Sequence, residues 1–247
     1  MAQTYAHDHG GHPPTSLGLN SRKLGLWAFI SSEVMFFTAL IATYLVMKPR
    51  NLRLGGPVPY DFLGIGLTAA LAFILLMSSL TMVLALAATE RNDQRGIRLW
   101  LGATILLGLM FLGGQVYEFN KLFNEYFVTI TTTLPDGTTR LVGVEEHEAE
   151  HELERIRAEA PAGARVEASQ PKPVTWSTSL FGSSFFTLTG FHGTHVGIGV
   201  IWLSIVLGMA FRGAISSRNS LTVEMAGLYW HFVDLVWVAI FTLIYLI

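Results

Sequence analysis

Five long apolar stretches, separated by polar connections, dominate the pattern along the chain. They cover residues 24–47, 62–89, 99–119, 180–211 and 221–247. A helix needs about 20 apolar residues to cross the hydrocarbon core of a bilayer, and each stretch is long enough. The pattern therefore predicts an all-α integral membrane protein, with five transmembrane helices in a bundle.

A polar segment between the third and fourth stretches, residues 128–178, interrupts this pattern. Threonine alternates with apolar residues on both sides of the sequence PDG at 135–137, which predicts a β-hairpin. Acidic residues followed by arginines over residues 145–160 predict a solvated helix, and residues 161–173 are typical of a linker. Because it has few large apolar residues, we expect a small extramembrane insertion without a core of its own.

These patterns divide the chain into four parts. The parts are a histidine-rich tail expected to be disordered (1–23), helices one to three (24–127), the insertion (128–178), and helices four and five (179–247).

Composition narrows the class of protein further. Hydrophobic residues make up 51% of the chain and charged residues only 14%, which is too apolar for a soluble domain. The net charge of −2 argues against a nucleic-acid partner, and the lack of cysteine excludes disulfides and thiolate metal sites.

Two groups of histidines outside the membrane stretches could suggest a metal site. Three lie in the tail, in a stretch rich in glycine and proline, and two alternate with glutamates on the solvated helix. The first pattern is typical of a disordered segment and the second of a solvated helical face. We therefore expect no bound metal at His7, His9, His12, His147 or His151.

Ionisable residues also occur inside the apolar stretches, where they are costly. Glu33, His195 and Asp234 all fall in the middle third of the membrane, on helices one, four and five. A polar cleft shared by these three helices is one interpretation. Glu33 itself is either a neutral structural acid bonded to a neighbouring helix, or a group that handles protons or faces lipid.

Other polar residues have simpler interpretations. Glu224, His231 and Asp234 are spaced to lie on one face of the last helix, where they would hold that face against other helices. His192 and His195 are three apart among glycines, which favours close approach of another backbone or a bound molecule. Gln115 and Glu118, near the end of helix three, have the pattern of an interfacial anchor. Ser78, Ser79 and Thr81 can bond to their own backbone or to a neighbour, so they need no special role.

Basic residues in the short connections predict the orientation. Placing the N-terminus in the cytoplasm puts seven basic residues of the tail and short loops inside and three outside. The C-terminus and the 128–178 insertion would then lie outside. The seven are Arg22, Lys23, Arg91, Arg95, Arg98, Arg212 and Arg218, and the three are Lys48, Arg50 and Arg53.

Four strings in the membrane stretches resemble those of subunit III of the haem–copper respiratory oxidases. They are ISSEVMFFT in helix one, GGQVYEF at the end of helix three, GSSFFTLTGFHGTHVGIG in helix four and VEMAGLYWHFVDLVW in helix five. They occur in the order found in that family, and the resemblance covers every predicted helix.

The resemblance implies a non-catalytic subunit of a proton-translocating terminal oxidase in aerobic respiration, located in a bacterial plasma membrane. Such a subunit packs against subunits I and II, which carry the haem and copper. It encloses structural phospholipid and supports proton uptake and the stability of the catalytic core. No catalytic residue, metal ligand or redox cofactor is expected in this chain, and an electron donor such as cytochrome c would act on it only indirectly.

The resemblance also assigns roles to individual residues. Glu33 matches the buried carboxylate of the family, while His195 and Arg212 match positions that contact lipid. The remaining matches are structural polar positions or contacts with partner subunits. These are Gln115, Glu118, His192, Glu224, His231 and Asp234.

The sequence departs from the family at two places and leaves alternatives open. Longer members have two additional N-terminal helices, so the chain resembles bacterial five-helix forms, and its insertion is longer than usual. Subunit III of a quinol oxidase typically has Asp in place of Glu33 and lacks a counterpart of Glu224, so cytochrome c oxidase is favoured. The alternatives are a quinol oxidase subunit, a homologue associated with nitric oxide reductase, or a free-standing transporter.

Overall fold

The computed structural model describes residues 21–57 and 64–246 of the chain. The histidine-rich part of the tail, residues 1–20, lies outside the described residues. Five of the described helices are long and apolar enough to cross a membrane, which confirms the predicted all-α membrane bundle. They are α1 (Ser21–Arg53), α3 (Ile65–Glu90), α4 (Gln94–Phe123), α6 (Leu180–Phe211) and α7 (Leu221–Phe241), the last continued by the π-helical η3 (Thr242–Leu246).

Two helices extend beyond their predicted ends because polar residues continue them. The first helix was expected to end at residue 47, but α1 runs through Pro49 to Arg53, whose charge favours a helix C-terminus. The third helix was expected to begin at residue 99, but α4 begins at Gln94, because the Asp93 carboxylate caps it by accepting a hydrogen bond from the Arg95 N–H (3.1 Å).

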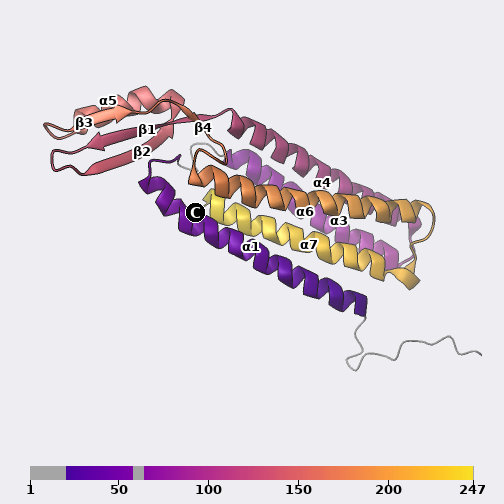
Figure 1. The fold of residues 1–247 in the computed structure, drawn as a ribbon. Coiled ribbons are helices and arrows are strands. Elements are labelled where there is room, and N and C mark those ends of the chain that lie inside the picture. The colour runs from indigo at the N-terminus through magenta and orange to yellow at the C-terminus, as the bar shows by residue number, and fades with distance from the viewer. Residues whose placement is uncertain (1–20, 58–63, 247) are drawn as a thin grey trace, which may run out of the picture.

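The five helices run side by side, with α7 in the centre and α1 at the edge of the bundle (Figure 1). In the most apolar segment of α7, 56% of the residues are buried inside the bundle, whereas in the corresponding segment of α1 the share is 17%. Trp230 of α7 fills the space between α4 and α6. A Cβ atom added at Gly108 would lie 2.7 Å from the Trp230 ring, and one added at Gly199 would lie 2.9 Å from it. Both glycines are therefore needed for this close packing.

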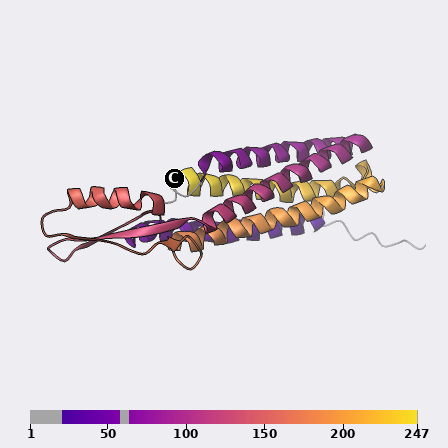
Figure 2. The ribbon, with the colours of Figure 1, turned by 90° about the horizontal axis from the view of Figure 1, so that it is seen from above.

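The insertion forms a sheet and a helix beyond one end of the bundle (Figures 1 and 2). Strands β1 (Tyr126–Thr133) and β2 (Thr139–Glu145) form the predicted antiparallel hairpin. At its turn, Gly137 has a φ of +82°, and the backbone N–H of Thr138 donates to Asp136 (2.8 Å), which lowers the pKa of that exposed carboxyl group. A short 3₁₀ turn, η1 (Glu146–Glu148), leads into α5 (Ala149–Glu159), the predicted solvated helix.

The prediction that residues 161–173 are a linker was wrong. This segment contains β3 (Arg165–Ala168) and β4 (Lys172–Pro173), and both strands pair antiparallel with β1. They are too short and polar to show the alternation typical of a strand, but the second edge of β1 supplies backbone partners for them. The result is a sheet in the order β2-β1-β3, with β4 also on β1.

The end of α1 is joined to α6 through one buried side chain and to the insertion through the turn that follows α1. The Asn51 side chain donates to the carbonyl of Pro57 (3.0 Å) and accepts from the backbone N–H of Phe181 at the start of α6 (3.2 Å). Nearby, Thr129 of β1 donates to the carbonyl of Gly55 (2.8 Å). A Cβ atom at Gly143 of β2 would lie 2.3 Å from a backbone oxygen of this turn, so the sheet and the end of α1 are in direct backbone contact.

Replacing Asn51 by alanine is expected to destabilise the protein by about 1–3 kcal/mol, because a buried N–H and a buried carbonyl lose their partner. Thermal and denaturant unfolding of the purified protein in detergent measures this. Asn124→Ala is the matched control, since Asn124 is exposed and bonds only within its own helix end (2.7 Å), and we expect a change within about 0.5 kcal/mol. Equal effects of the two substitutions would contradict the role given to Asn51.

Candidate functional site

Glu33 of α1 and His195 of α6 form a carboxyl–imidazole pair inside the membrane-spanning region. Glu33 Oε2 lies 3.1 Å from His195 Nε2, and the two side chains are 20% and 14% exposed. The other ring nitrogen, Nδ1, lies 2.7 Å from the carbonyl oxygen of Phe191. The pair therefore lies at the seam between α1 and α6, shielded by helices but not sealed from the lipid side.

The chemistry of these contacts determines where protons can be. A carbonyl oxygen only accepts hydrogen bonds, so His195 Nδ1 must carry a hydrogen. If the ring is neutral, Nε2 is an acceptor and Glu33 must be protonated; if the ring is cationic, Glu33 is a carboxylate. In both arrangements one proton lies between Glu33 and His195, so the pair can hold a proton without a net charge in the bilayer.

Aromatic side chains position the pair. Phe37 of α1 packs edge-on against His195 at 5.0 Å between ring centroids. Tyr229 of α7 donates from its hydroxyl to the carbonyl oxygen of His195 (3.0 Å). Three helices thus fix the place of the imidazole. Glycines at 193 and 197 in α6 have open space where a Cβ atom would be, so no backbone approaches them here.

The second histidine of helix four, His192, lies apart from this pair. It is fully buried between α4 and α7, stacked on Trp237 at 4.9 Å and edge-on to Phe111 at 5.8 Å. Neither of its ring nitrogens has a hydrogen-bond partner within the described residues. Two residues three apart lie on roughly the same face of a helix, but they are still rotated relative to each other about its axis. Because of this rotation His192 points into the bundle and His195 points towards α1.

The polar residues of the last helix also meet different neighbours. Glu224, in the first turn of α7, forms an ion pair with Lys23 of α1, and His231 Nδ1 lies 2.5 Å from the hydroxyl of Ser79 on α3. Asp234 is 4% exposed and interacts with the side chain of Ser79, although neither of its carboxylate oxygens makes a well-formed hydrogen bond in the described part of the chain. The structure therefore does not bring Asp234 into contact with Glu33 and His195. The helix-holding role predicted for this face stays a prediction, although two of its members do contact other helices.

The hydroxyl residues of helix two for which the sequence predicted no special role have hydrogen-bond partners on neighbouring helices. Ser78 accepts from the indole N–H of Trp230 (2.9 Å), and Ser79 contacts His231. Thr81 lies 2.8 Å from Thr104 of α4. Both expected kinds of partner occur, because Ser78 and Thr81 also donate to carbonyls of their own helix. The sequence could not say which neighbouring residues they contact.

Gln115 and Glu118 are not interfacial anchors, as their position near a helix end suggested. Each is 4% exposed, and Glu118 accepts a hydrogen bond from the Thr68 hydroxyl of α3 (2.7 Å). The amide of Gln115 has no partner among the described residues. The error follows from the helix end: α4 continues to Phe123, so these residues lie about one turn further from the terminus than predicted.

Arg212 is exposed at the C-terminal end of α6, far from the pair. It is 17 residues beyond His195, which corresponds to roughly 25 Å along a helix. The two positions expected to contact lipid are therefore far apart along α6, and the structure does not bring them together. Within residues 21–57 and 64–246, no group of three or more His, Cys, Asp or Glu side chains is placed to hold a metal ion.

A double-mutant cycle tests the coupling of Glu33 and His195. We expect alanine at both positions to reveal a coupling of about 1–2 kcal/mol, near the upper end of hydrogen bonds between membrane helices. Unfolding of the four proteins in detergent provides the free energies. Thr38 and Thr194 lie on the same two helices but bond to their own backbones, at 2.7 and 2.9 Å, so their cycle should give about zero. A similar value for both cycles would show that Glu33 and His195 are not coupled.

Comparison with known proteins places this geometry in context. The family described as cytochrome c oxidase subunit III matches residues 164–247. Cytochrome c oxidase subunit 3 of Alkalihalophilus pseudofirmus is 30% identical over 236 residues, which is 95% of this chain and 91% of the relative. Two proteins of Bacillus subtilis, cytochrome c oxidase subunit 3 and quinol oxidase subunit 3, are 32% and 31% identical over 223 residues, 90% of this chain and 84% and 85% of theirs.

Proposed function

Because the chain belongs to the subunit III family of the haem–copper oxidases, we propose that it is a non-catalytic subunit of a proton-translocating cytochrome c oxidase. It packs on subunit I of that complex, holds structural phospholipid and supports proton uptake by the catalytic core. The observation that carries this proposal is the contact between Glu33 and His195, which joins the family string of helix one to that of helix four. Haem and copper are assigned to the partner subunits.

The place of the pair supports a role at the lipid face. Phe36 of α1 and Phe191 of α6 are 36% and 45% exposed and pack edge-on at 5.1 Å beside it. An acyl chain lying against these rings would cover the pair and lower the local dielectric. A proton shared within the pair then stays there until water or a partner group reaches it. Arg212, at the end of the same helix, suits a lipid phosphate.

The electron donor and the orientation are also part of the proposal. Glu33 and Glu224 favour cytochrome c over quinol, although the relatives include both types of oxidase at similar identity. The connections 91–94 and 212–220 meet at the end of the bundle opposite the insertion, where Asn92 contacts Ser217 (2.9 and 3.1 Å). Basic residues of both connections thus gather on one face, which supports a cytoplasmic N-terminus and an outside insertion. With this orientation we expect the insertion to contact subunit II, an electron-donor protein or a neighbouring complex.

Gentle purification of the tagged chain from its native membrane tests the function. We expect haem-bearing subunits to co-purify, with a reduced-minus-oxidised visible spectrum and oxidation of added ferrocytochrome c. Oxidation of quinol in its place would identify a quinol oxidase. Recovery of the chain without haem would contradict the oxidase assignment and favour a transporter. A haem-bearing partner that reduces nitric oxide and oxidises neither cytochrome c nor quinol with oxygen would identify a homologue associated with nitric oxide reductase.

Glu33→Gln tests the role of the shared proton in the assembled oxidase. Because the amide cannot release a proton, we expect oxidase activity to decay about tenfold faster during turnover, with assembly unchanged, as for a loss of ~1.4 kcal/mol. Oxygen consumption followed over many turnovers measures the decay. Glu90→Gln, an exposed change at the end of α3, is the control and should leave the lifetime as it is. An unchanged rate and lifetime in Glu33→Gln would rule out a role of Glu33 in proton handling.

A further inference from the structure

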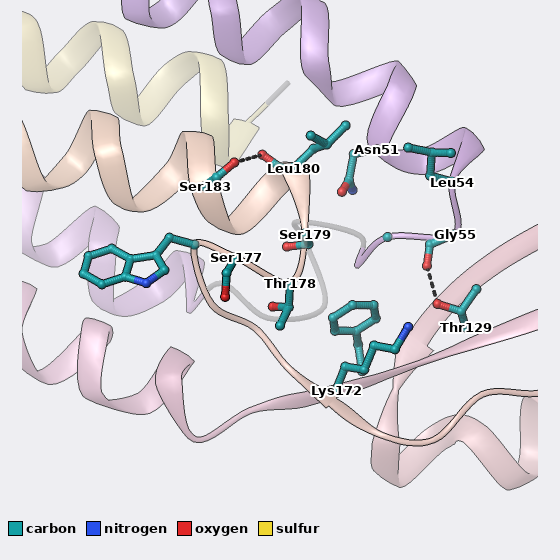
Figure 3. Close-up of a pocket in the computed structure, with 13 residues that line it drawn as sticks. Asn51, Leu54, Gly55, Thr129, Lys172, Ser177, Thr178, Ser179, Leu180 and Ser183 are labelled. Carbon is teal, nitrogen blue, oxygen red and sulfur yellow. Dashed lines mark hydrogen bonds between the residues drawn. The ribbon is translucent and has the colours of Figure 1, made fainter.

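A polar pocket of about 290 Å³ lies where the insertion meets the start of α6 (Figure 3). Ser177, Thr178 and Ser179 line it from the segment that leads into α6. Lys172 of β4 lines it from the sheet, and Asn51, Leu54, Gly55 and Gly56 line it from the end of α1 and the turn that follows. Neither Glu33 nor His195 is among the residues that line this pocket.

The charge of this pocket is positive and comes from a single side chain. Lys172 forms no ion pair or side-chain hydrogen bond within the described part of the chain, and no carboxylate occurs among the described lining residues. The first backbone N–H groups of α6 are already used. Phe181 donates to Asn51 (3.2 Å) and Gly182 to the Ser179 hydroxyl (2.9 Å). The hydroxyl groups of Thr178, Thr129 and Ser183 donate to backbone carbonyls. An anion in the pocket would therefore be held by Lys172 and by the hydroxyl groups of Ser177 and Ser179 rather than by the helix terminus.

The pocket lies at the level of a membrane interface. Trp176, which lines it, is 68% exposed, and Tyr126 at the start of β1 is 43% exposed. Exposed Trp and Tyr side chains at the ends of membrane helices are typical of the headgroup region. Phosphate groups of lipids lie at this depth.

An apolar groove of about 260 Å³ continues from the pocket into the membrane-spanning region. It runs between α1 and α6 and shares Leu180 and Ser183 with the polar pocket. Its hydroxyl groups are turned to their own helices: Ser184 donates to the carbonyl of Leu180 (2.6 Å) and Thr187 to that of Ser183 (2.6 Å). The groove therefore presents mainly carbon atoms, the surface that an acyl chain requires.

We propose that the pocket and the groove together bind an anionic phospholipid. Its phosphate contacts Lys172 and the hydroxyl groups, and an acyl chain follows the groove between α1 and α6 towards the Glu33–His195 pair. This inference rests on the lipid-holding role proposed above and adds a second headgroup position to it. The 32 residues of α6 span roughly 48 Å, which is more than the thickness of the hydrocarbon core. Lys172, before the start of α6, and Arg212, directly after its end, would therefore contact lipids of opposite leaflets.

Photo-crosslinking in the intact, purified complex tests the site. The probe is phosphatidylglycerol with a diazirine on its acyl chain, and the readout is labelling of peptides covering residues 40–47 and 180–187. Lys172→Gln is expected to lower this labelling about fivefold, which corresponds to ~1 kcal/mol for one basic residue near the lipid headgroups. Lys172→Arg should retain it. Lys121→Gln, which removes an exposed charge from the end of α4 nearest the insertion, should leave it unchanged.

Several results would overturn the inference. Two results would show that Lys172 does not select an anionic headgroup. One is labelling of the Lys172→Gln variant at the level of the wild type, and the other is labelling of the wild type by a zwitterionic phosphatidylcholine probe as strong as that by phosphatidylglycerol. Protection of Lys172 from amine-reactive reagents by inorganic phosphate, without acyl labelling of the groove, would identify free phosphate as the occupant. Because the complex is first verified to contain its haem-bearing subunits, each of these failures leaves the proposed oxidase function intact.

Discussion

The interior of a bilayer offers no water to hydrate a polar side chain, so such a side chain is stabilised mainly by partners on other helices. In this protein these contacts also set the rotation of the helices. Helices that are apolar on nearly all sides can turn about their axes at little cost, because lipid tails and leucine side chains are equally apolar. The cross-helix contacts remove that freedom. They are Glu33–His195, Thr68–Glu118, Ser79–His231 and Ser78–Trp230.

The helix that depends most on such contacts is α1, the least buried of the five. It is attached at one end by the ion pair of Lys23 with Glu224, in the middle by Glu33, and at the far end by the buried Asn51. Between these points much of its surface faces outward. The groove beside α6 is a consequence of this arrangement: two helices joined at intervals leave space between the attachments, and lipid is what fills space in a membrane.

The helices could be predicted from the sequence, whereas contacts between them could not. Long apolar stretches located all five helices, and the PDG turn located the hairpin. Of Glu33, His195 and Asp234, which the sequence suggested could share one polar cleft, only Glu33 and His195 meet, because helix rotation is not encoded in hydropathy. Strands β3 and β4 were missed for a related reason: their partner is the edge of β1, which lies some 40 residues away along the chain.

Burial distinguishes the four membrane carboxylates from one another. Glu118 and Asp234 are each 4% exposed inside the bundle, where neither lipid nor a partner subunit reaches them without a rearrangement of helices. Glu224 lies in the first turn of its helix and is neutralised by Lys23. Glu33 differs from these three because it is partly exposed at the surface of the bundle and lies beside an imidazole that can share its proton. If this chain exchanges protons with its surroundings inside the membrane, as proposed above, we therefore expect the exchange at Glu33 and His195 rather than at the other three carboxylates.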